Sequence, residues 1–343
     1  MKKVVIHKPG GYRQLTIEDC PDPEPADDEV LIDVHAAGVN FADCVSRMGL
    51  YASAKRYEGY PLTPGFEASG IIRRAGSKVD DLEAGTPVIA VSRFNACATR
   101  LVVPRHQVFR LPPQLTLASA AALPTAALTA WFALPELAHP RPGNTTLVHS
   151  AAGGVGSMLV QMGKLAGCTV TGVVGAAHKV DSVRELGADV VIDKSSQDLW
   201  SGAGRFDIIL DANGADTLRD SYAHLAPVGK LVVYGFHGML HTRRGVPKRL
   251  RLALDYLRTP RFSPFDLTTH NRSVLGFNLS YLFDRKDILQ RGMQEILGWI
   301  ETGKLRLPAI SYYPLEAVAD AHRDLESGRT VGKLVLLTGD AQL

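Results

Sequence analysis

The feature that most constrains the fold is a glycine-rich turn at positions 153–156. It follows a β-prone run, Thr145–His149, and precedes a segment whose apolar residues fall close to helical spacing. Gly153 lets the backbone approach a pyrophosphate, Gly156 allows close helix–sheet packing, and the helix N-terminus offers N–H groups to the anion. The alternative is an ordinary tight turn, but the flanking strand and helix favour a dinucleotide site. Its predicted residues are Ala151, Gly153, Gly154, Val155 and Gly156.

The choice of dinucleotide depends on the end of the next strand. An NAD site carries Asp or Glu about 20 residues after the glycine turn, where it holds the ribose 2′-hydroxyl. Here residues 173–179 read Val-Val-Gly-Ala-Ala-His-Lys, and the first acid is Asp181. An ammonium group at Lys179 favours the 2′-phosphate of NADP. The alternative is that Lys179 is a solvated lysine at the start of a helix. The sequence therefore predicts NADPH as the cofactor.

Composition narrows the class of protein. A chain of 343 residues is too long for one ordinary core, so two domains are expected. The 38 basic and 35 acidic residues give a net charge of +3, which argues against a general nucleic-acid-binding protein. The cysteines form no C-x-x-C pair, so we expect neither a disulfide framework nor a cysteine zinc site. We find no apolar run near the roughly 18–20 residues that span a bilayer, and no secretion signal, and we expect a cytoplasmic protein.

The chain changes character near Thr116. Before it, short β-segments are separated by turns, and we expect nothing helical of any length before about Leu117. These candidate strands are Val30–Ala37, Glu67–Arg74, Pro87–Val91 and Thr99–Val103. After an Ala- and Leu-rich helical stretch, strands and helices alternate, which implies a parallel sheet covered by helices on both faces.

A last strand at Lys333–Leu337 should return to the β-rich region that precedes Thr116, which we call the front module. We therefore predict a β-rich domain made from residues 1–122 and 279–343. A doubly wound α/β domain at 123–278 is inserted into it.

Several segments resemble one family in sequence and in order. They are Gly38–Asp43, Arg47–Tyr51, Pro61–Glu67, Leu123–Ala130 and Ala151–Gly156. These resemble the motifs of quinone oxidoreductases, the zinc-independent branch of the medium-chain dehydrogenase/reductase superfamily, over nearly the whole chain. The insertion at 239–271, followed by Gly276-Phe277-Asn278-Leu279, resembles the synaptic-vesicle VAT-1 group. The resemblance implies a Rossmann-type sheet inserted into a GroES-like β-rich domain, and a homodimer joined edge to edge through the α/β sheet.

Whether this chain has the ligands for a catalytic zinc ion can be judged position by position. Catalytic zinc needs three protein ligands, usually Cys and His, and one open position. Where the zinc-dependent relatives carry Cys, His and Cys, this chain has Asn40, Phe66 and Thr125, of which none is a good zinc ligand. The four-cysteine structural lobe is also missing, because only Cys97 lies in that region. We predict catalysis without metal.

The resemblance implies that the nicotinamide lies in the cleft between the domains and passes hydride directly to a small electron acceptor. Quinones and α,β-unsaturated carbonyls fit, because conjugation spreads the developing negative charge. We expect Asn40, Asp43 and Tyr51 near the acceptor. The Asn40 amide is a candidate oxyanion donor, or it only holds the turn; Tyr51 is a candidate proton donor. Asp43 alternatively forms an ion pair with Arg47 that shapes the loop.

Further cofactor contacts are expected outside the glycine turn. Thr129 lies near the nicotinamide according to the resemblance, although it could equally be a helix-interior threonine. Asn213 and Phe236 follow later strands of the parallel sheet, where ligands gather at the carboxyl ends. Lys333 and Arg329 are candidate phosphate contacts near the C-terminus.

The insertion is strongly basic. Between positions 242 and 261 the only acid is Asp255, against seven basic residues, Arg243, Arg244, Lys248, Arg249, Arg251, Arg258 and Arg261. Leu250, Ala253, Leu254 and Leu257 have the spacing of a short helix with one apolar face. We favour a helix that covers the cleft, and contact with an anionic membrane or a protein partner is the alternative. Two functions follow: an NADPH-dependent reductase, or a non-catalytic NADPH-binding protein that docks through this insertion.

Overall fold

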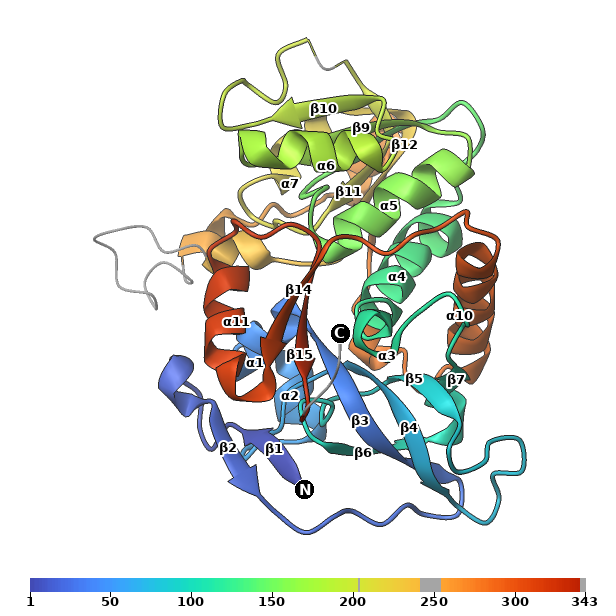
Figure 1. Cartoon of the computed structure of the whole chain (residues 1–343). Coiled ribbons are helices and arrows are strands. Elements are labelled where there is room, and N and C mark those ends of the chain that lie inside the picture. The colour runs from blue at the N-terminus through green and yellow to red at the C-terminus, as the bar shows by residue number, and fades with distance from the viewer. Residues whose placement is uncertain (203, 241–253, 340–343) are drawn as a thin grey trace. The chain divides into compact units, whose positions relative to one another are not determined.

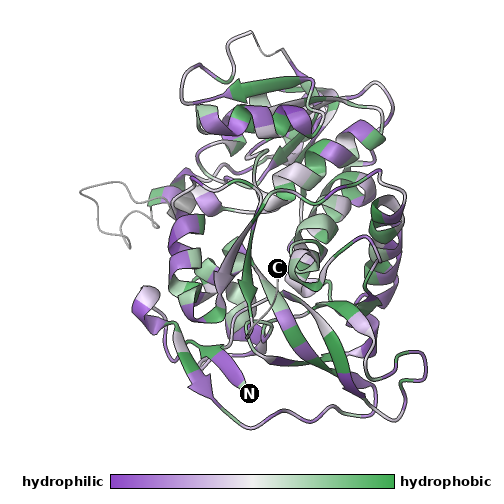
Figure 2. Cartoon of the chain, viewed as in Figure 1, coloured by the Kyte–Doolittle hydropathy of each residue, from purple (hydrophilic) through white to green (hydrophobic). Residues whose placement is uncertain are grey.

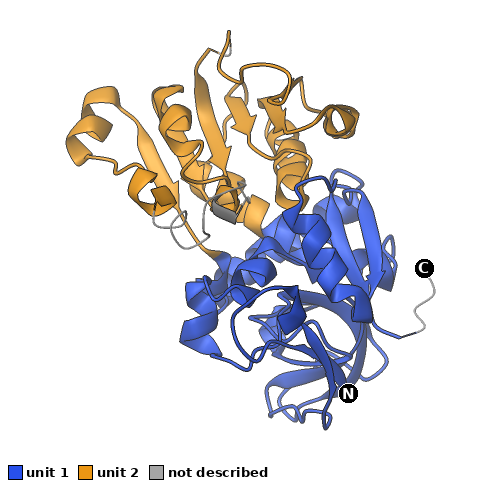
Figure 3. Cartoon of the chain, turned by 90° about the vertical axis from the view of Figure 1, so that its left-hand side faces the viewer, with its two compact units in different colours: residues 1–128, 279–343 blue, residues 129–278 orange. Residues whose placement is uncertain are grey.

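The computed structural model describes residues 1–202, 204–240 and 254–339. The chain forms two compact units (Figure 3): unit 1 contains residues 1–128 and 279–343, and unit 2 contains residues 129–278. We predicted domain boundaries after residues 122 and 278, whereas the compact units divide after residues 128 and 278. The predicted domain boundaries stay a prediction. Each unit is described here by itself.

Unit 1 is built on a seven-stranded sheet in the order β14-β15-β3-β4-β5-β7, with β6 also paired to β3. Its strands are β3 (Glu29–Val39), β4 (Glu67–Ala75), β5 (Pro87–Val91), β6 (Arg100–Pro104), β7 (Val108–Arg110), β14 (Ile310–Pro314) and β15 (Lys333–Leu337). The last strand, β15, runs antiparallel to β3, with Leu334 opposite Val39, so the chain does return to its front module as predicted. A separate ribbon pairs β1 (Lys2–Val5) with β2 (Thr16–Asp19).

In the described part of unit 1 the helices are α1 (Phe41–Arg47), α2 (Ala52–Tyr57), α3 (Leu117–Ala120), α10 (Lys286–Glu301) and α11 (Val318–Glu326). Our expectation of nothing helical before Leu117 is therefore wrong for two short elements, α1 and α2. A helix of six or seven residues is too short to show a periodic apolar pattern. In Figure 2, α10 alternates hydrophobic and hydrophilic residues along its length, as an amphipathic surface helix does.

Unit 2 carries a six-stranded sheet in the order β10-β9-β8-β11-β12-β13. The strands are β8 (Thr145–Val148), β9 (Thr169–Val174), β10 (Val190–Asp193), β11 (Phe206–Asp211), β12 (Leu225–Val233) and β13 (Ser273–Gly276). Every neighbouring pair is parallel. In chain order this is 3-2-1-4-5-6, the doubly wound Rossmann arrangement, whose direction of winding reverses between β8 and β11. The predicted fold class is confirmed.

The helices of unit 2 follow its strands. They are α5 (Gly154–Leu165), α6 (Val180–Glu185), α7 (Leu218–Ala223) and α9 (Pro264–His270), with α4 (Pro124–Trp131) entering from unit 1. α5 packs on β8 and β9, and α6 packs on β10 (Figure 1). The core is apolar along the parallel strands, as a sheet buried on both faces requires; Leu147, Val173 and Ile209 are all almost fully buried.

Short helical turns connect these elements. The 3-10 turns are Tyr12–Gln14, Arg105–Gln107, Ala177–Lys179, His237–Leu240, Leu279–Tyr281 and Leu315–Ala317, and a π-helix covers Phe132–Ala138. The helix that we predicted around Leu250 and Ala253 falls on residues 241–253, outside the described residues. On its described flank, residues 254–258 are helical.

One helical segment, Leu117–Ala138, is apolar and long enough to cross a membrane by length and composition. Our sequence reading did not find it, because Ser119 and Pro124 interrupt the apolar run. Of the tested window, 78% is buried inside the protein. A buried core helix passes the same test, so this segment is weak support for a membrane span.

Candidate active site

The glycine turn joins β8 to α5 in unit 2. Gly153 is the N-cap of α5 in an extended conformation, and no side chain caps the helix there. A Cβ at Gly156 would lie 2.2 Å from the Ser150 carbonyl oxygen and 2.8 Å from the Ala151 Cα, so this position requires glycine. A Cβ at Gly153 would approach only the Ser150 oxygen, at 3.3 Å. The five predicted cradle residues thus lie together at an uncapped helix N-terminus, the local structure that binds phosphate groups.

Lys179 lies in the 3-10 turn that follows β9. Its side chain is 9% exposed, and burial lowers the pKa of its ammonium group. Between the end of β9 and Asp181 the chain carries no acid that could hold a ribose 2′-hydroxyl. An anionic phosphate next to this buried ammonium group would stabilise its charged form. This geometry is compatible with the predicted role of Lys179.

The loops after β11 and β12 meet the glycine turn. Asn213 Oδ1 accepts a hydrogen bond of 3.0 Å from the hydroxyl of Ser150. The Phe236 ring lies against Gly214, where a Cβ would be 2.6 Å from its Cδ1 atom. Asn213 and Phe236 therefore lie beside the turn, at the carboxyl ends of the strands. Thr129 is on α4, half-buried.

Asp211, at the end of β11, organises this loop, and the sequence reading missed it. The buried carboxylate accepts hydrogen bonds from the backbone N–H of Asn213 (2.8 Å) and Gly214 (3.2 Å). It also accepts one from the Ser221 hydroxyl at 3.0 Å, and Ser221 Oγ lies 3.0 Å from His149 Nε2. These three side chains are fully buried, and the serine donates to the aspartate rather than to the histidine. We interpret the trio as support for the loop, not as a nucleophile.

In unit 1, Asn40, Phe66 and Thr125, the three residues that we compared with zinc ligands, come together around Glu67. Asn40 Nδ2 donates to Glu67 Oε1 at 2.8 Å, and the Thr125 backbone N–H donates to Glu67 Oε2 at 2.7 Å. The Thr125 hydroxyl donates to the Phe66 carbonyl at 3.3 Å. Glu67 is fully buried, and the missing side chain of Gly38 makes room for it, since a Cβ there would lie 2.3 Å from Oε1.

A lysine ammonium group completes this cluster. Lys333 Nζ lies 2.9 Å from the Val39 carbonyl oxygen, 2.7 Å from Asn40 Oδ1 and 2.7 Å from Glu67 Oε1. Its side chain is 5% exposed. These three acceptors use the three N–H groups of the ammonium in this structure, and contact between Lys333 and a cofactor phosphate stays a prediction. Its partners lie in a distant part of the sequence, which a reading of local motifs does not reveal.

Two further expectations about the 40–51 loop need correction or refinement. Asp43 does not pair with Arg47; its carboxylate accepts hydrogen bonds from the backbone N–H of Asn40 (2.8 Å) and Gly65 (2.7 Å). Burial raises the pKa of Asp43 to about 7. The Asn40 amide donates to Glu67 and to the Gly38 carbonyl, the latter at 3.3 Å, so both of its N–H groups have acceptors within the protein.

Tyr51 is the N-cap of α2 and is half-buried. Its hydroxyl donates to Ser280 Oγ at 3.3 Å. Its ring stands edge-on to Phe66 and Phe94, with centroid distances of 5.9 and 6.4 Å. Phe94 and Ser280 had no signal in the sequence, because each comes from a separate loop. Phe66 and Phe94 are buried, so they fix the position of the half-buried Tyr51 ring.

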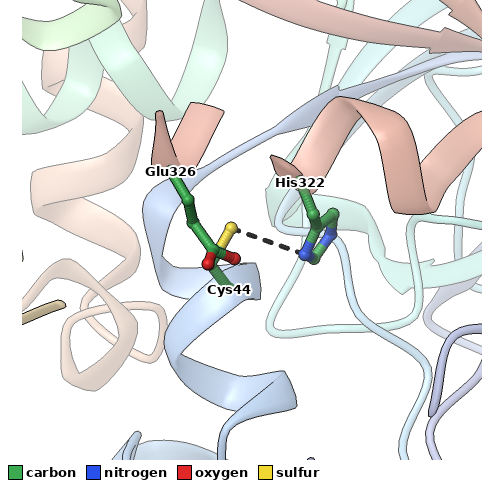
Figure 4. Close-up of side chains that lie close together, drawn as sticks. All are labelled: Cys44, His322 and Glu326. Atoms are coloured by element: carbon green, nitrogen blue, oxygen red, sulfur yellow. Dashed lines mark hydrogen bonds between the residues drawn. The ribbon is translucent and has the colours of Figure 1, made fainter. Parts of the chain in front are cut away.

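Figure 4 shows Cys44, His322 and Glu326, which lie close enough together to hold a metal ion. A cation already occupies this position: the Arg47 guanidinium lies 3.3 Å from His322 Nδ1 and 2.7 Å from Glu326 Oε1. Burial raises the pKa of the Cys44 thiol and lowers that of His322 to about 3, which keeps both neutral. The group therefore joins α1 to α11 by a buried ion pair and is not a metal centre.

A Rossmann-type sheet carried by a GroES-like β-rich unit defines a medium-chain dehydrogenase/reductase. The family models agree: "Alcohol dehydrogenase GroES-like domain" matches residues 26–113 and "Zinc-binding dehydrogenase" matches residues 186–336. The chain is 33% identical to the rat synaptic vesicle membrane protein VAT-1 homolog over 96% of its length and 82% of the relative. The chain thus belongs to the quinone oxidoreductase family of this superfamily, in its VAT-1-like group.

Two other similarities concern chemistry. The Escherichia coli quinone oxidoreductase, solved as a complex with NADPH, has a TM-score of 0.84 to this structure at 26% identity, covering 98% of this chain and all of the other. A Burkholderia 2-haloacrylate reductase is 28% identical over 97% of this chain and 98% of its own length.

Proposed function

We propose that this protein binds NADPH and reduces quinones or α,β-unsaturated carbonyls by hydride transfer, without a metal. The observation that carries the proposal is the uncapped glycine turn at Gly153–Gly156, followed by Lys179 in place of an acid. The similarity to an NADPH complex of a quinone oxidoreductase supports the same choice of cofactor. In this proposal unit 2 holds the phosphates, and Asn213 and Phe236 contact the cofactor from the neighbouring loops.

When bound, NADPH supplies a hydride with its two electrons. The chain's own residues bind and orient the acceptor. The buried rings of Phe66 and Phe94 hold the half-buried Tyr51 ring in place. The Tyr51 hydroxyl, which donates to Ser280 Oγ at 3.3 Å in this structure, is proposed to turn from Ser280 to the oxygen on which charge develops. Asn40 and Lys333 act as positioning residues, because their polar groups already bind Glu67 and each other.

Independence of metal is part of the proposal. The three positions that we compared with zinc ligands hold Asn40, Phe66 and Thr125. The charge of the nearby Glu67 carboxylate is neutralised by Lys333. Elemental analysis of active protein should find less than one zinc per two chains, and chelator should leave turnover unchanged. Stoichiometric zinc together with loss of activity on chelation would overturn this part.

The main experiment follows the absorbance of NADPH with a panel of benzoquinones and enones. We expect turnover with NADPH to exceed that with NADH at equal concentration. Lys179→Ala should reduce this preference by about tenfold, the scale of one charge-assisted contact. Lys164→Ala, which removes a surface lysine paired with Asp189, should not alter it. No binding of either dinucleotide would overturn the proposal.

A second candidate function is docking through the insertion by a non-catalytic NADPH-binding protein. Tyr256, Leu257 and Phe265 on its described flank are 72%, 75% and 86% exposed, beside Arg258 and Arg261. The test is flotation with anionic liposomes, comparing the intact protein with a deletion of residues 243–261. Binding of NADPH without turnover on any acceptor, together with flotation lost on deletion, would favour this function.

A further inference from the structure

An exposed arginine in unit 1 is stacked against two tyrosines. The guanidinium carbon of Arg56, on α2, lies 5.4 Å from the ring centroid of Tyr57 and 5.7 Å from that of Tyr281. The two rings lie 5.8 Å apart, and Arg93 packs on Tyr57 from 4.0 Å. We call Arg56, Tyr57, Arg93 and Tyr281 the arginine–tyrosine cluster. Cation–π contacts of this kind hold a guanidinium in place by its face and leave its N–H edge available.

The two arginines of the cluster differ in their partners. Arg93 donates to the Ser280 carbonyl and to Asp284, both at 3.0 Å, so its charge is paired. Glu58, the acid nearest in sequence, also interacts with Arg93. Arg56 is exposed, and within residues 1–202, 204–240 and 254–339 no carboxylate lies within ion-pair distance of it. The cluster therefore presents one positive charge that the described part of the protein does not neutralise.

The cluster adjoins the proposed acceptor site. Tyr51 caps the helix that carries Arg56 and Tyr57, and its hydroxyl bonds to Ser280 Oγ. Ser280 in turn precedes Tyr281 and accepts from Arg93 through its carbonyl. The cluster and Tyr51 thus share both α2 and the turn Leu279–Tyr281, all within unit 1.

We propose that Arg56 binds the carboxylate of the acceptor, so that the substrates of this enzyme are conjugated carboxylic acids. A planar guanidinium matches a carboxylate with two parallel hydrogen bonds, and the rings of Tyr57 and Tyr281 hold the Arg56 guanidinium by its face. This inference rests on the proposed function. The carbon β to the carboxylate gains hydride from NADPH and the α carbon gains a proton from water. The C=C π bond breaks, and NADPH becomes NADP⁺. Arg56 offsets the extra negative charge that develops on the carboxylate side.

The test compares 2-chloroacrylate with 2-chloroacrylamide, a neutral acceptor of nearly the same shape. Arg56→Met should raise the KM for the acid about three- to fivefold, as expected for one partly exposed ion pair. The KM values for the amide and for NADPH should not change. Lys55→Met, which removes the neighbouring exposed cation on α2, is the matched control and should leave all three values unchanged.

The outcomes separate this inference from the proposed function. If neutral quinones and enones are reduced but Arg56→Met affects acid and amide equally, or neither, Arg56 does not bind the carboxylate. An equal effect of Lys55→Met would also overturn the inference, because it would show that positive surface charge attracts the acid without a specific contact to Arg56. If no acceptor is reduced, the proposed function itself fails. Arg56→Lys should recover part of the affinity for the acid, because it restores the charge without the bidentate geometry.

Discussion

At the level of single residues, the buried ion pair of Glu67 and Lys333 organises the region around Asn40. Glu67 is fully buried and Lys333 nearly so, and between them they hold Asn40 and the backbone of Thr125. Removing one partner of such a pair leaves the other charge buried without compensation, which is far more unfavourable than losing a surface pair. Lys333 therefore stabilises the folded structure of the region in which Asn40 was predicted to act.

Lys333→Met should lower the free energy of unfolding by about 3–5 kcal/mol, the range for breaking a buried pair. Lys78→Met, which removes an exposed pair with Asp27, should leave it nearly unchanged. Urea denaturation measures both. The double variant Glu67→Gln with Lys333→Met should lose less than the sum of its single variants. Strict additivity of the two changes would show that the two side chains do not interact.

The two outer glycines of the turn should behave differently when changed to alanine. Gly156→Ala forces a Cβ into the backbone of Ser150 and Ala151, so we expect a loss of stability of about 1–3 kcal/mol. The Cβ of Gly153→Ala meets one oxygen at 3.3 Å, so this change should alter the free energy of unfolding by less than about 1 kcal/mol. It should lower the affinity for NADPH, because in the proposed site its methyl group faces the phosphate. Thermal unfolding and NADPH titration separate the two effects. Unchanged affinity in Gly153→Ala would mean that the pyrophosphate is not seated there.

These residues also show what the sequence could reveal. The role of Gly156 was predictable, because a strand, a turn and a helix adjacent in the chain determine its surroundings. The role of Lys333 was not, since its partner Asn40 is 293 positions away and only the folded sheet brings β15 next to β3. Arg47 was misassigned for the same reason: its partner Glu326 lies on the distant helix α11.

At the level of elements, α1 depends on a buried acid. Asp43 Oδ2 accepts the backbone N–H of Asn40, the residue that caps the helix, while Oδ1 accepts that of Gly65. The carboxyl group thus connects the start of α1 to the loop before β4. The long strands and α5 were predictable from patterning, whereas α1 and α2 are specified by such tertiary contacts rather than by apolar periodicity.

The contribution of Asp43 to the stability of the protein should fall as pH rises from about 4 to 7, whereas the buried histidines His149 and His322, whose pKa values burial lowers, contribute in the opposite direction. Burial raises the pKa of Asp43 from its ordinary value of 3.8 to about 7 in the folded chain, while Lys333 lowers it and Glu67 raises it by less than burial does. Over this range the folded state therefore binds more protons at this carboxyl than the unfolded state does, and the contribution of Asp43 to the free energy of unfolding decreases as pH increases. Asp43→Asn should be less stable throughout but should lose this component of the slope. Parallel pH profiles for the two proteins would contradict it.

At the level of the whole molecule, the sheet of unit 2 ends in strand β13. Among the described strands only β12 pairs with it, so its other side presents backbone groups without a neighbouring strand. Unpaired edges are usually covered or paired. The homodimer that we predicted from the family resemblance would pair two such edges. The sequence could indicate this arrangement only through the resemblance, because an edge strand and an internal strand have the same apolar pattern here.

The backbone geometry of β13 allows a sharp test of this dimer. Phe277 donates its N–H to Val233 on β12, so in an alternating strand Leu275 also faces β12, and Val274 directs its N–H outward. Val274→Pro removes an outward donor, whereas Val274→Ala shortens the side chain and keeps the donor. Light scattering should show that the proline variant dissociates at protein concentrations where the alanine variant stays dimeric. Leu275→Pro should instead lower the thermal unfolding temperature, because it breaks the ladder to β12. If Val274→Pro and Val274→Ala have the same mass as the parent dimer, the interface lies elsewhere on the molecule.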